Sequence, residues 1–209
     1  MRIESLKTTP DRAGRYWVKW SDGSSVALYR QTVEDFGLYA GLEMDEEQFL
    51  RLQEAAAKMS ARMRAVRIVS ASSVSKRDLQ QRLVHKGEDP EQAKAAVEWM
   101  EELELLDDRK TALQVVERCV AKGYGISRAR QALYEKKIPK NLWEEVLEDY
   151  PDQTEKIEAF LRSKLGQNWD DKDLKRAIDA SMRRGHSYHD IRKALARLEA
   201  DADEFPEEW

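Results

Sequence analysis

Apolar residues recur along most of the chain at the spacing of amphipathic helices. In the clearest case they step by three and four residues and share one helical face: Phe49, Leu52, Ala56, Met59, Met63 and Val66. Asp45 begins this helix, because an Asp at the N-cap with Gln48 three residues later forms a capping box. A serine-rich stretch from residue 70 to 75 ends it. The pattern predicts one long connecting helix over residues 45–73.

The first forty residues follow a different pattern. The runs IESLK, RYWVKW and SVALYR are short and rich in aromatic and β-branched residues, which is typical of strands. Asp22-Gly23 lies between the last two runs and suits a tight hairpin turn, in which both central residues need a positive φ. We therefore expect an antiparallel β meander, with a short helix, over residues 1–44. So small a sheet must pack on the helices that follow.

Signals for helix starts and stops then alternate to the end of the chain. Ser75, Asp89-Pro90, Asp107-Asp108, Ser127, Pro139, Pro151 and Ser187 are the predicted starts. Lys86-Gly87 and Gly123 are predicted stops, since glycine readily takes the left-handed conformation that ends a helix. The region is therefore predicted to be entirely helical.

One combination of stop and start occurs twice. KGYGISRARQAL begins at Lys122 and RGHSYHDIRKAL begins at Arg184, and Leu83, Leu133 and Leu195 fall at matching places. We interpret these as three-helix units over residues 74–123, 124–167 and 168–200, with an acidic tail at residues 201–209. Chance recurrence of helix stops is the alternative. Tandem units of this kind form an elongated, curved rod.

Composition and charge agree with such a protein. Hydrophobic residues make up 41% of the chain and charged residues 36%, which suits an elongated helical protein with much surface. The net charge of −4 conceals segregation: residues 58–87 carry eight bases and one acid, and residues 88–108 carry nine acids and one base. Residues 172–197 are again basic. This alternation indicates surfaces for different neighbours, or simply salt-bridged helix faces.

The residues that usually carry catalysis are missing from the sequence. It has no glycine-rich phosphate loop, and its three histidines lack the companions of a metal site. His186 and His189 are expected at the surface or in helix caps, and Cys119 as a core thiol. No apolar run suits a membrane helix. We therefore expect a cytoplasmic protein that is not an enzyme and has no metal or cofactor.

The remaining candidates are bases that lie off the apolar faces of the predicted helices. They are Arg77, Arg82, Lys86, Lys122, Arg128, Arg130, Lys136, Lys137, Arg183, Arg184, Arg192 and Lys193. Corresponding places in three repeats would line one side of a rod, which suits a phosphate backbone or an acidic protein groove. For any one of them taken alone, an ordinary solvated side chain is the favoured alternative.

Three motifs follow one another along the chain. They are Ser75-x-x-Asp78-Leu79-x-x-Arg82-Leu83-x-x-Lys86-Gly87, Leu103-x-x-Leu106-Asp107-Asp108-x-x-x-Ala112, and Lys122-Gly123-x-Gly125 leading to Arg130-x-x-Leu133-x-x-Lys136-x-Ile138. Their order and spacing resemble the RecX family, regulators of the bacterial recombinase RecA. The N-terminal strands are similar to an extension that many members carry. Glu104 and Lys137 stand where the family usually has glycine, and Thr111 where it has an aromatic residue.

The resemblance implies a function as well as a three-repeat helical fold. Such a protein binds in the helical groove of the RecA filament on single-stranded DNA, blocks filament extension and strand exchange, and lowers ATP hydrolysis. The expected partners are RecA and the DNA within its filament, with bare DNA bound weakly and no membrane contact, and the expected state is a monomer. The alternative is a stand-alone DNA-binding helical repeat protein, for which the pI of about 5.6 is unfavourable.

Overall fold

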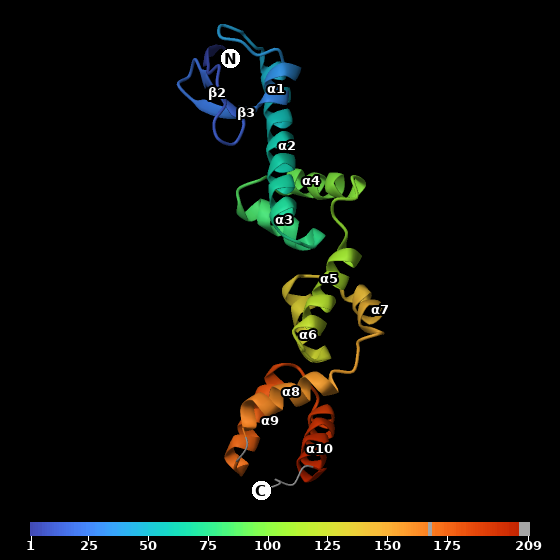
Figure 1. The fold of residues 1–209 in the computed structure, drawn as a ribbon. Helices are drawn as coiled ribbons and strands as arrows, with labels where there is room; N and C mark the ends of the chain where they lie inside the picture. The colour runs from blue at the N-terminus through green and yellow to red at the C-terminus, as the bar shows by residue number, and fades with distance from the viewer. Residues whose placement is uncertain (167–168, 205–209) are drawn as a thin grey trace. The chain divides into compact units, whose positions relative to one another are not determined.

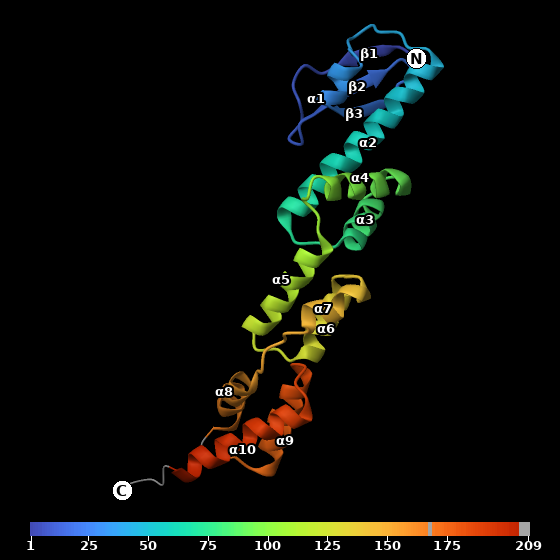
Figure 2. The same cartoon turned by 90° about the vertical axis from the view of Figure 1, so that its right-hand side faces the viewer.

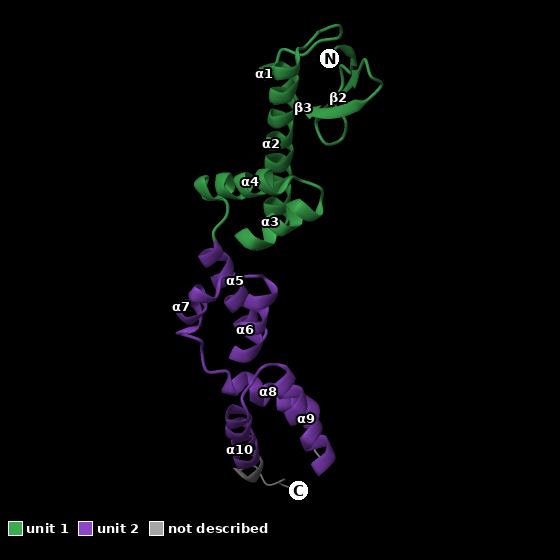
Figure 3. Ribbon diagram, turned by 180° about the vertical axis from the view of Figure 1, so that it is seen from behind, with its two compact units in different colours: residues 1–107 green, residues 108–209 purple. Residues whose placement is uncertain are grey.

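The computed structural model describes residues 1–166 and 169–204, the side chains to residue 200. These residues form three strands and ten α-helices, which confirms the expected mainly helical class (Figure 1). The chain divides into two compact units, residues 1–107 and residues 108–209 (Figure 3).

Unit 1 begins with the predicted meander and continues with helices. Its elements are β1 (Ile3–Leu6), β2 (Arg15–Trp20), β3 (Ser25–Tyr29), α1 (Arg30–Asp35), α2 (Glu46–Ala71), α3 (Lys76–His85) and α4 (Pro90–Glu102). The sheet is antiparallel in the order β1-β2-β3. In β2 and β3 the register runs from Arg15 opposite Tyr29 to Lys19 opposite Ser25.

The sheet is stabilised by α2, which runs beside it (Figure 2). Val18 and Leu28 are buried on the inner face of the sheet and share a core with Leu52 of α2. Trp20 meets Phe49 of α2 edge to face, with ring centres 5.0 Å apart. This packing supplies the apolar contacts that three short strands cannot make among themselves.

Helix α2 begins at the predicted capping box, and its later residues pack in a second core. The Asp45 carboxylate accepts from the Gln48 backbone N–H at 2.8 Å, and the Gln48 side chain accepts from the Asp45 N–H at 3.1 Å. Further along, Ala61 and Ala65 are fully buried against α3 and α4. Alanine at these positions lets the three helices approach closely, so α2 links the sheet to a three-helix bundle.

Unit 2 contains two further three-helix cores. Its elements are α5 (Asp108–Ala121), α6 (Ile126–Glu135), the 3₁₀ helix η1 (Lys140–Leu142), α7 (Trp143–Leu147), α8 (Thr154–Leu165), α9 (Asp171–Arg183) and α10 (Tyr188–Glu204). One core joins α5, α6 and α7 around Leu133, and the other joins α8, α9 and α10 around Leu161. The buried thiol of Cys119 belongs to the first core, as expected. The repeat boundaries and the curved rod stay predictions.

Residues 139–154 depart from the sequence prediction. The helix predicted after Pro139 is found as two short pieces, η1 and α7, which end at Leu147. The helix predicted to begin at Pro151 begins later, because α8 starts at Thr154. Asp152 explains the late start, because its carboxylate accepts from the Thr154 backbone N–H at 2.8 Å and holds a turn there. Proline also disfavours helical geometry at Tyr150, the residue before it.

Glu104 and Lys137, where the family resemblance led us to expect glycine, have unusual backbone geometry. Each has a φ of 56°, and among the described residues they are the two non-glycine residues with a positive φ. Each follows the end of a helix, where glycine is favoured because it has no Cβ. The departure from the family pattern therefore changes the residue and keeps the left-handed conformation.

Candidate partner-binding surfaces

Part of the basic segment 58–87 is used inside unit 1. The guanidinium of Arg64 lies 2.8 Å from the buried carboxylate of Glu88, in the turn between α3 and α4. The guanidinium of Arg62 lies 4.7 Å from the ring centre of Trp99 on α4. These contacts join α2 to its neighbours, so the charges of Arg62 and Arg64 stabilise the fold of unit 1.

The three candidate bases on or beside α3 differ in their surroundings. Arg77 and Lys86 are exposed. Arg82 forms an ion pair with Asp78, one helical turn earlier, at 2.8 Å. Asp78 is buried, which makes this pair part of the local structure of α3. Among the three, Arg77 and Lys86 are thus directed to solvent.

The candidates around α6 divide in the same way. Lys122 and Arg130 are exposed, and Lys136 and Lys137 are half-buried at the end of the helix. The guanidinium of Arg128 lies 3.0 Å from Glu135 and, by hydrogen bonding to it, lowers the pKa of that carboxyl group. Ile126 and Tyr134 flank Arg130 at intervals of four residues and are also exposed. Ile126, Arg130 and Tyr134 thus form an exposed stripe along α6. Their spacing could have predicted this stripe, but a search for basic residues alone leaves out Ile126 and Tyr134.

On α9 and α10, Arg183 and Arg192 are exposed. Lys193 lies 3.2 Å from the carboxylate of Asp152. Hydrogen bonds from the Thr154 side chain and backbone, followed by the bond from Lys193, lower the pKa of Asp152 to about 2. Lys193 therefore holds α10 to the segment before α8.

Arg184 has a structural position. Its guanidinium donates to the backbone carbonyls of Lys122 at 2.5 Å and Gly123 at 3.3 Å. It also lies 4.6 Å from the ring centre of Phe160 and 5.0 Å from that of Tyr124. Carbonyls at the end of α5 attract a cation because the helix dipole is negative there. Arg184 thus fastens α9 to α5 and α8.

The two similar sequence stretches lie against each other inside unit 2. The Gly125 backbone N–H donates to the Arg184 carbonyl at 2.9 Å, and the Ser127 N–H donates to the Gly185 carbonyl at 3.3 Å. A Cβ on Gly125 would lie 2.0 Å from the Gly185 carbonyl oxygen. We call this contact the glycine joint. It requires glycine on steric grounds, because residues that precede α6 and α10 meet backbone to backbone.

His186 is part of the glycine joint, and of the two expected positions, at the surface or in a helix cap, the surface position is wrong. The side chain is buried, and its Nε2 lies 3.0 Å from the Gly123 carbonyl oxygen. Burial is the main cause of a lowered pKa for this imidazole. The ring is therefore neutral near pH 7 and donates its Nε2–H to that carbonyl. A contact between residues so distant in the sequence has no local signal.

A pocket of about 330 Å³ lies beside the glycine joint, lined in part by Tyr150, Gln153, His186 and Asp190. Two of its polar groups serve the structure, since His186 bonds to Gly123 and Asp190 bonds to Ser187, whereas the buried Oε1 of Gln153 has no hydrogen-bond partner among the described residues. The described residues contain no cluster of three or more His, Cys, Asp or Glu that could hold a metal ion. In the same residues, no helix is both long and apolar enough to cross a membrane.

The structure therefore defines a mainly helical protein in which exposed bases, some beside exposed apolar residues, are available for binding. Comparison with known proteins shows what the chain is similar to. No family model matches, but the chain is 27% identical over 146 residues to regulatory protein RecX of Vibrio parahaemolyticus, across 68% of this chain and 94% of that protein. It is 24% identical over 203 residues to regulatory protein RecX of Clostridioides difficile, across 94% of each.

Solved structures agree with these relatives. A crystal structure of regulatory protein RecX matches with a TM-score of 0.64 at 18% identity, across 92% of this chain and 98% of that one. RecX from Lactobacillus salivarius matches with a TM-score of 0.62 at 17% identity, across 70% and 99%. In sequence the chain is similar to RecX regulatory proteins over most of its length, as its three motifs indicated, and its fold is RecX-like. The family is one of regulatory proteins, and the expectation of a non-enzymatic protein agrees with it.

Proposed function

We propose that this protein regulates RecA by binding to the filament that RecA forms on single-stranded DNA. The observation that carries the proposal is the similarity to RecX regulatory proteins over most of the chain. In the mechanism that the family resemblance implies, the bound protein blocks filament extension and strand exchange and lowers ATP hydrolysis by RecA. It acts by occupying the filament groove.

Exposed bases support a binding role. Lys86, Arg130 and Arg192 lie on or beside α3, α6 and α10, and within the described part of the chain none of them has an acidic partner. An exposed cation without an internal partner loses little when it meets a phosphate or a carboxylate. By contrast, Arg82, Arg128 and Lys193 would first have to leave Asp78, Glu135 and Asp152.

RecA activity on single-stranded DNA tests the proposal directly. ATP hydrolysis and strand exchange are measured with RecA from the same organism while this protein is titrated in. Both activities are expected to fall to a plateau. Unchanged rates at saturating protein would contradict the proposal.

The contribution of the bases is tested by charge reversal. The triple variant Lys86→Glu, Arg130→Glu, Arg192→Glu is expected to need roughly tenfold more protein for half-maximal inhibition, and the inhibition should depend less on salt. The matched control is Lys94→Glu, Lys140→Glu, Lys172→Glu, which makes the same charge change at exposed lysines outside the candidate set. Equal inhibition by the two variants, both folded by circular dichroism, would remove these three bases from the interface.

The alternative of a stand-alone DNA-binding protein predicts tight binding to bare duplex or single-stranded DNA with a steep salt dependence. Fluorescence anisotropy with bare duplex DNA, without RecA and at two salt concentrations, distinguishes the two functions. We expect bare duplex DNA to bind weakly, because the net charge of −4 opposes association with a polyanion.

A further inference from the structure

The sheet of unit 1 has a second face, which α2 reaches through Arg67, whose guanidinium lies 5.9 Å from the ring centre of Tyr29. Side chains alternate along β2, so that Val18 and Trp20 point into the core while Trp17 and Lys19 point the other way. Trp17 is 41% exposed although it lies in the middle strand of the sheet. A tryptophan at this position adds little to the core, which already contains Trp20.

A second aromatic residue shares this outer face. Trp17 lies opposite Ala27, and Arg15 lies opposite Tyr29. Tyr29 is therefore the diagonal neighbour of Trp17, at the roughly 7–8 Å separation that such pairs have in antiparallel sheets. Ala27 presents only a methyl group opposite the indole. The two rings thus follow one another across this face, with Trp17 exposed and the guanidinium of Arg67 over the ring of Tyr29.

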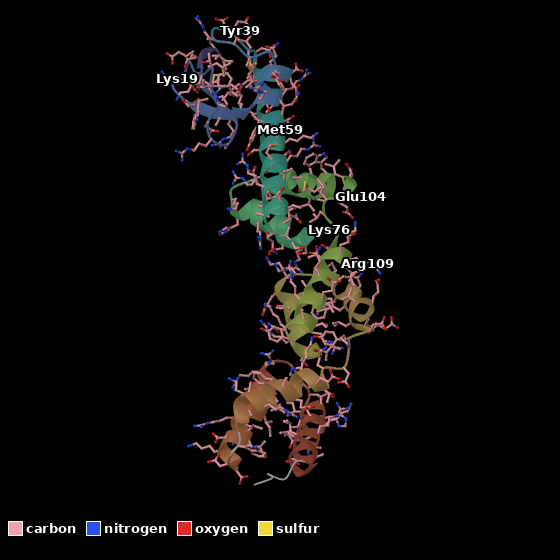
Figure 4. All side chains as sticks on the ribbon, in the orientation of Figure 1. Lys19, Tyr39, Met59, Lys76, Glu104 and Arg109 are labelled. Atoms are coloured by element: carbon pink, nitrogen blue, oxygen red, sulfur yellow. The ribbon has the colours of Figure 1, made fainter. Side chains whose placement is uncertain are left out.

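Cations surround the rings. The Lys7 backbone N–H donates to the Trp17 carbonyl at 2.9 Å, which places the exposed Lys7 beside Trp17 on the neighbouring strand. Lys19, labelled in Figure 4, lies 2.5 Å from Glu4, with both side chains at least half exposed. Such a pair is weak in water, so Lys19 can exchange its carboxylate for another anion. Arg15 is less available, since two of its nitrogens donate to Asp11.

We infer that this outer face, consisting of Trp17, Tyr29, Lys7 and Lys19, binds single-stranded nucleic acid. An unpaired base stacks on the indole of Trp17 and the next base lies toward Tyr29, while Lys7 and Lys19 contact the phosphates. Aromatic rings on a positively charged surface bind single strands with little sequence preference, because every base has a π face. A duplex fits poorly, since its bases are already stacked on one another.

This inference does not rest on the proposed regulation of RecA. The site belongs to the N-terminal sheet, whereas the bases proposed to act in the filament lie on α3, α6 and α10 or beside them. The oligonucleotide experiments below contain no recombinase. Loss of oligonucleotide binding with retained RecA inhibition would therefore refute only the inference, and the reverse result would refute only the proposed function.

The test measures fluorescence anisotropy of labelled 15-nucleotide dT and rU strands and of a duplex of equal length, titrated with the full chain at low salt. Both single strands are expected to bind more tightly than the duplex, and the tighter of the two identifies the natural ligand as DNA or RNA. Trp17→Ala should weaken single-strand binding about tenfold, and Trp17→Phe should retain most of it. Tyr39→Ala, which removes a more exposed ring from a segment outside the sheet, should bind like the unmodified protein (Figure 4).

The lysines are tested by salt dependence. The double variant Lys7→Gln, Lys19→Gln should lower the slope of log affinity against log salt by about 1.4, since each of the two phosphate contacts on a single strand contributes about 0.7. Trp17→Ala should leave that slope unchanged, because stacking releases no counterions. Urea unfolding confirms that Trp17→Ala is folded, as its side chain lies outside the core. Equal affinity of Trp17→Ala and Tyr39→Ala, preference for the duplex, or no binding by the unmodified protein would each overturn the inference.

Discussion

Helices α6 and α10 of unit 2 have different N-caps, although the sequences at their N-termini are similar. Before α10, Ser187 caps the helix, and its hydroxyl accepts from the Asp190 backbone N–H at 3.1 Å. Before α6, the matching position is Gly125, which has no side chain to cap with. Gly125 instead donates its backbone N–H to the Arg184 carbonyl at 2.9 Å. Two stretches with similar sequences thus have different N-caps because they are the two sides of one contact.

The difference shows that local preference is overruled where two backbones meet. Serine and glycine differ by only a few tenths of a kcal/mol as N-caps, so capping alone decides little between them. The space at the contact decides which residue can stand at position 125, since a Cβ at Gly125 would overlap the Gly185 carbonyl. The asymmetry can be tested by exchanging the two residues.

The largest effect is expected for Gly125→Ser. The new Cβ must displace the backbone of Gly185, and such overpacking costs about 3 kcal/mol of unfolding free energy. The φ of Gly125 is −79°, which any residue tolerates, so the loss would come from the contact alone. Urea unfolding measures it. The reciprocal variant, Ser187→Gly, is the control and should lose only a few tenths of a kcal/mol. Similar losses in both variants would show that the contact does not require glycine.

The next largest loss of stability is expected when Arg184, whose guanidinium binds carbonyls at the glycine joint, is replaced. Arg184→Met keeps most of the side-chain volume but removes the bonds to the Lys122 and Gly123 carbonyls, and should cost about 2 kcal/mol in urea unfolding. Arg183→Met is the matched control. Arg183 is exposed, so its replacement should change stability by less than about 0.5 kcal/mol. Equal losses would mean that Arg184 acts only through its charge.

The histidine of the joint predicts a dependence on pH. Burial lowers the pKa of His186 below its ordinary value of 6.5, so the unfolded chain binds a proton at a pH where the folded one does not. The stability that the neutral ring provides is therefore fully present above pH 6.5 and declines as pH falls below it. Arg184 acts in the same direction as burial, whereas the bond to Gly123 and the charge of Asp190 oppose it.

Urea midpoints measured between pH 7.5 and 5.5 test this dependence. The unmodified protein should lose stability across that range. His186→Gln, which can still donate to Gly123, should lose less. His189→Gln changes an exposed histidine three residues later, in α10, and should behave like the unmodified protein. If His186→Gln shows the full decline, other groups cause it.

These regions also show how far the sequence could predict the structure. The strands, the capping box at Asp45 and the stops at Gly87 and Gly123 follow from neighbours in the sequence, and all are found. The glycine joint could not be predicted, because it depends on residues about sixty positions apart. For the same reason, Arg184 was predicted from the sequence to be a candidate for partner binding. Its carbonyl and ring partners lie far from it in the sequence, so no neighbouring residues indicate these contacts.

The smallest effect is expected where a helix of unit 1 ends without glycine. After α4, the Glu104 N–H donates to the Glu101 carbonyl and the Leu105 N–H donates to that of Met100, and Gly87 occupies the same place after α3. Glu104 has a φ of 56°, which costs a residue with a Cβ about 1–2 kcal/mol, while glycine loses more backbone entropy on folding. Glu104→Gly should therefore stabilise the protein by about 0.5 kcal/mol, seen as a higher urea midpoint.

Gly87→Ala makes the opposite change where no atom lies within 4 Å of the added Cβ, and should destabilise by about 1 kcal/mol. A lower midpoint for Glu104→Gly would show that the Glu104 side chain contributes more than its backbone strain costs.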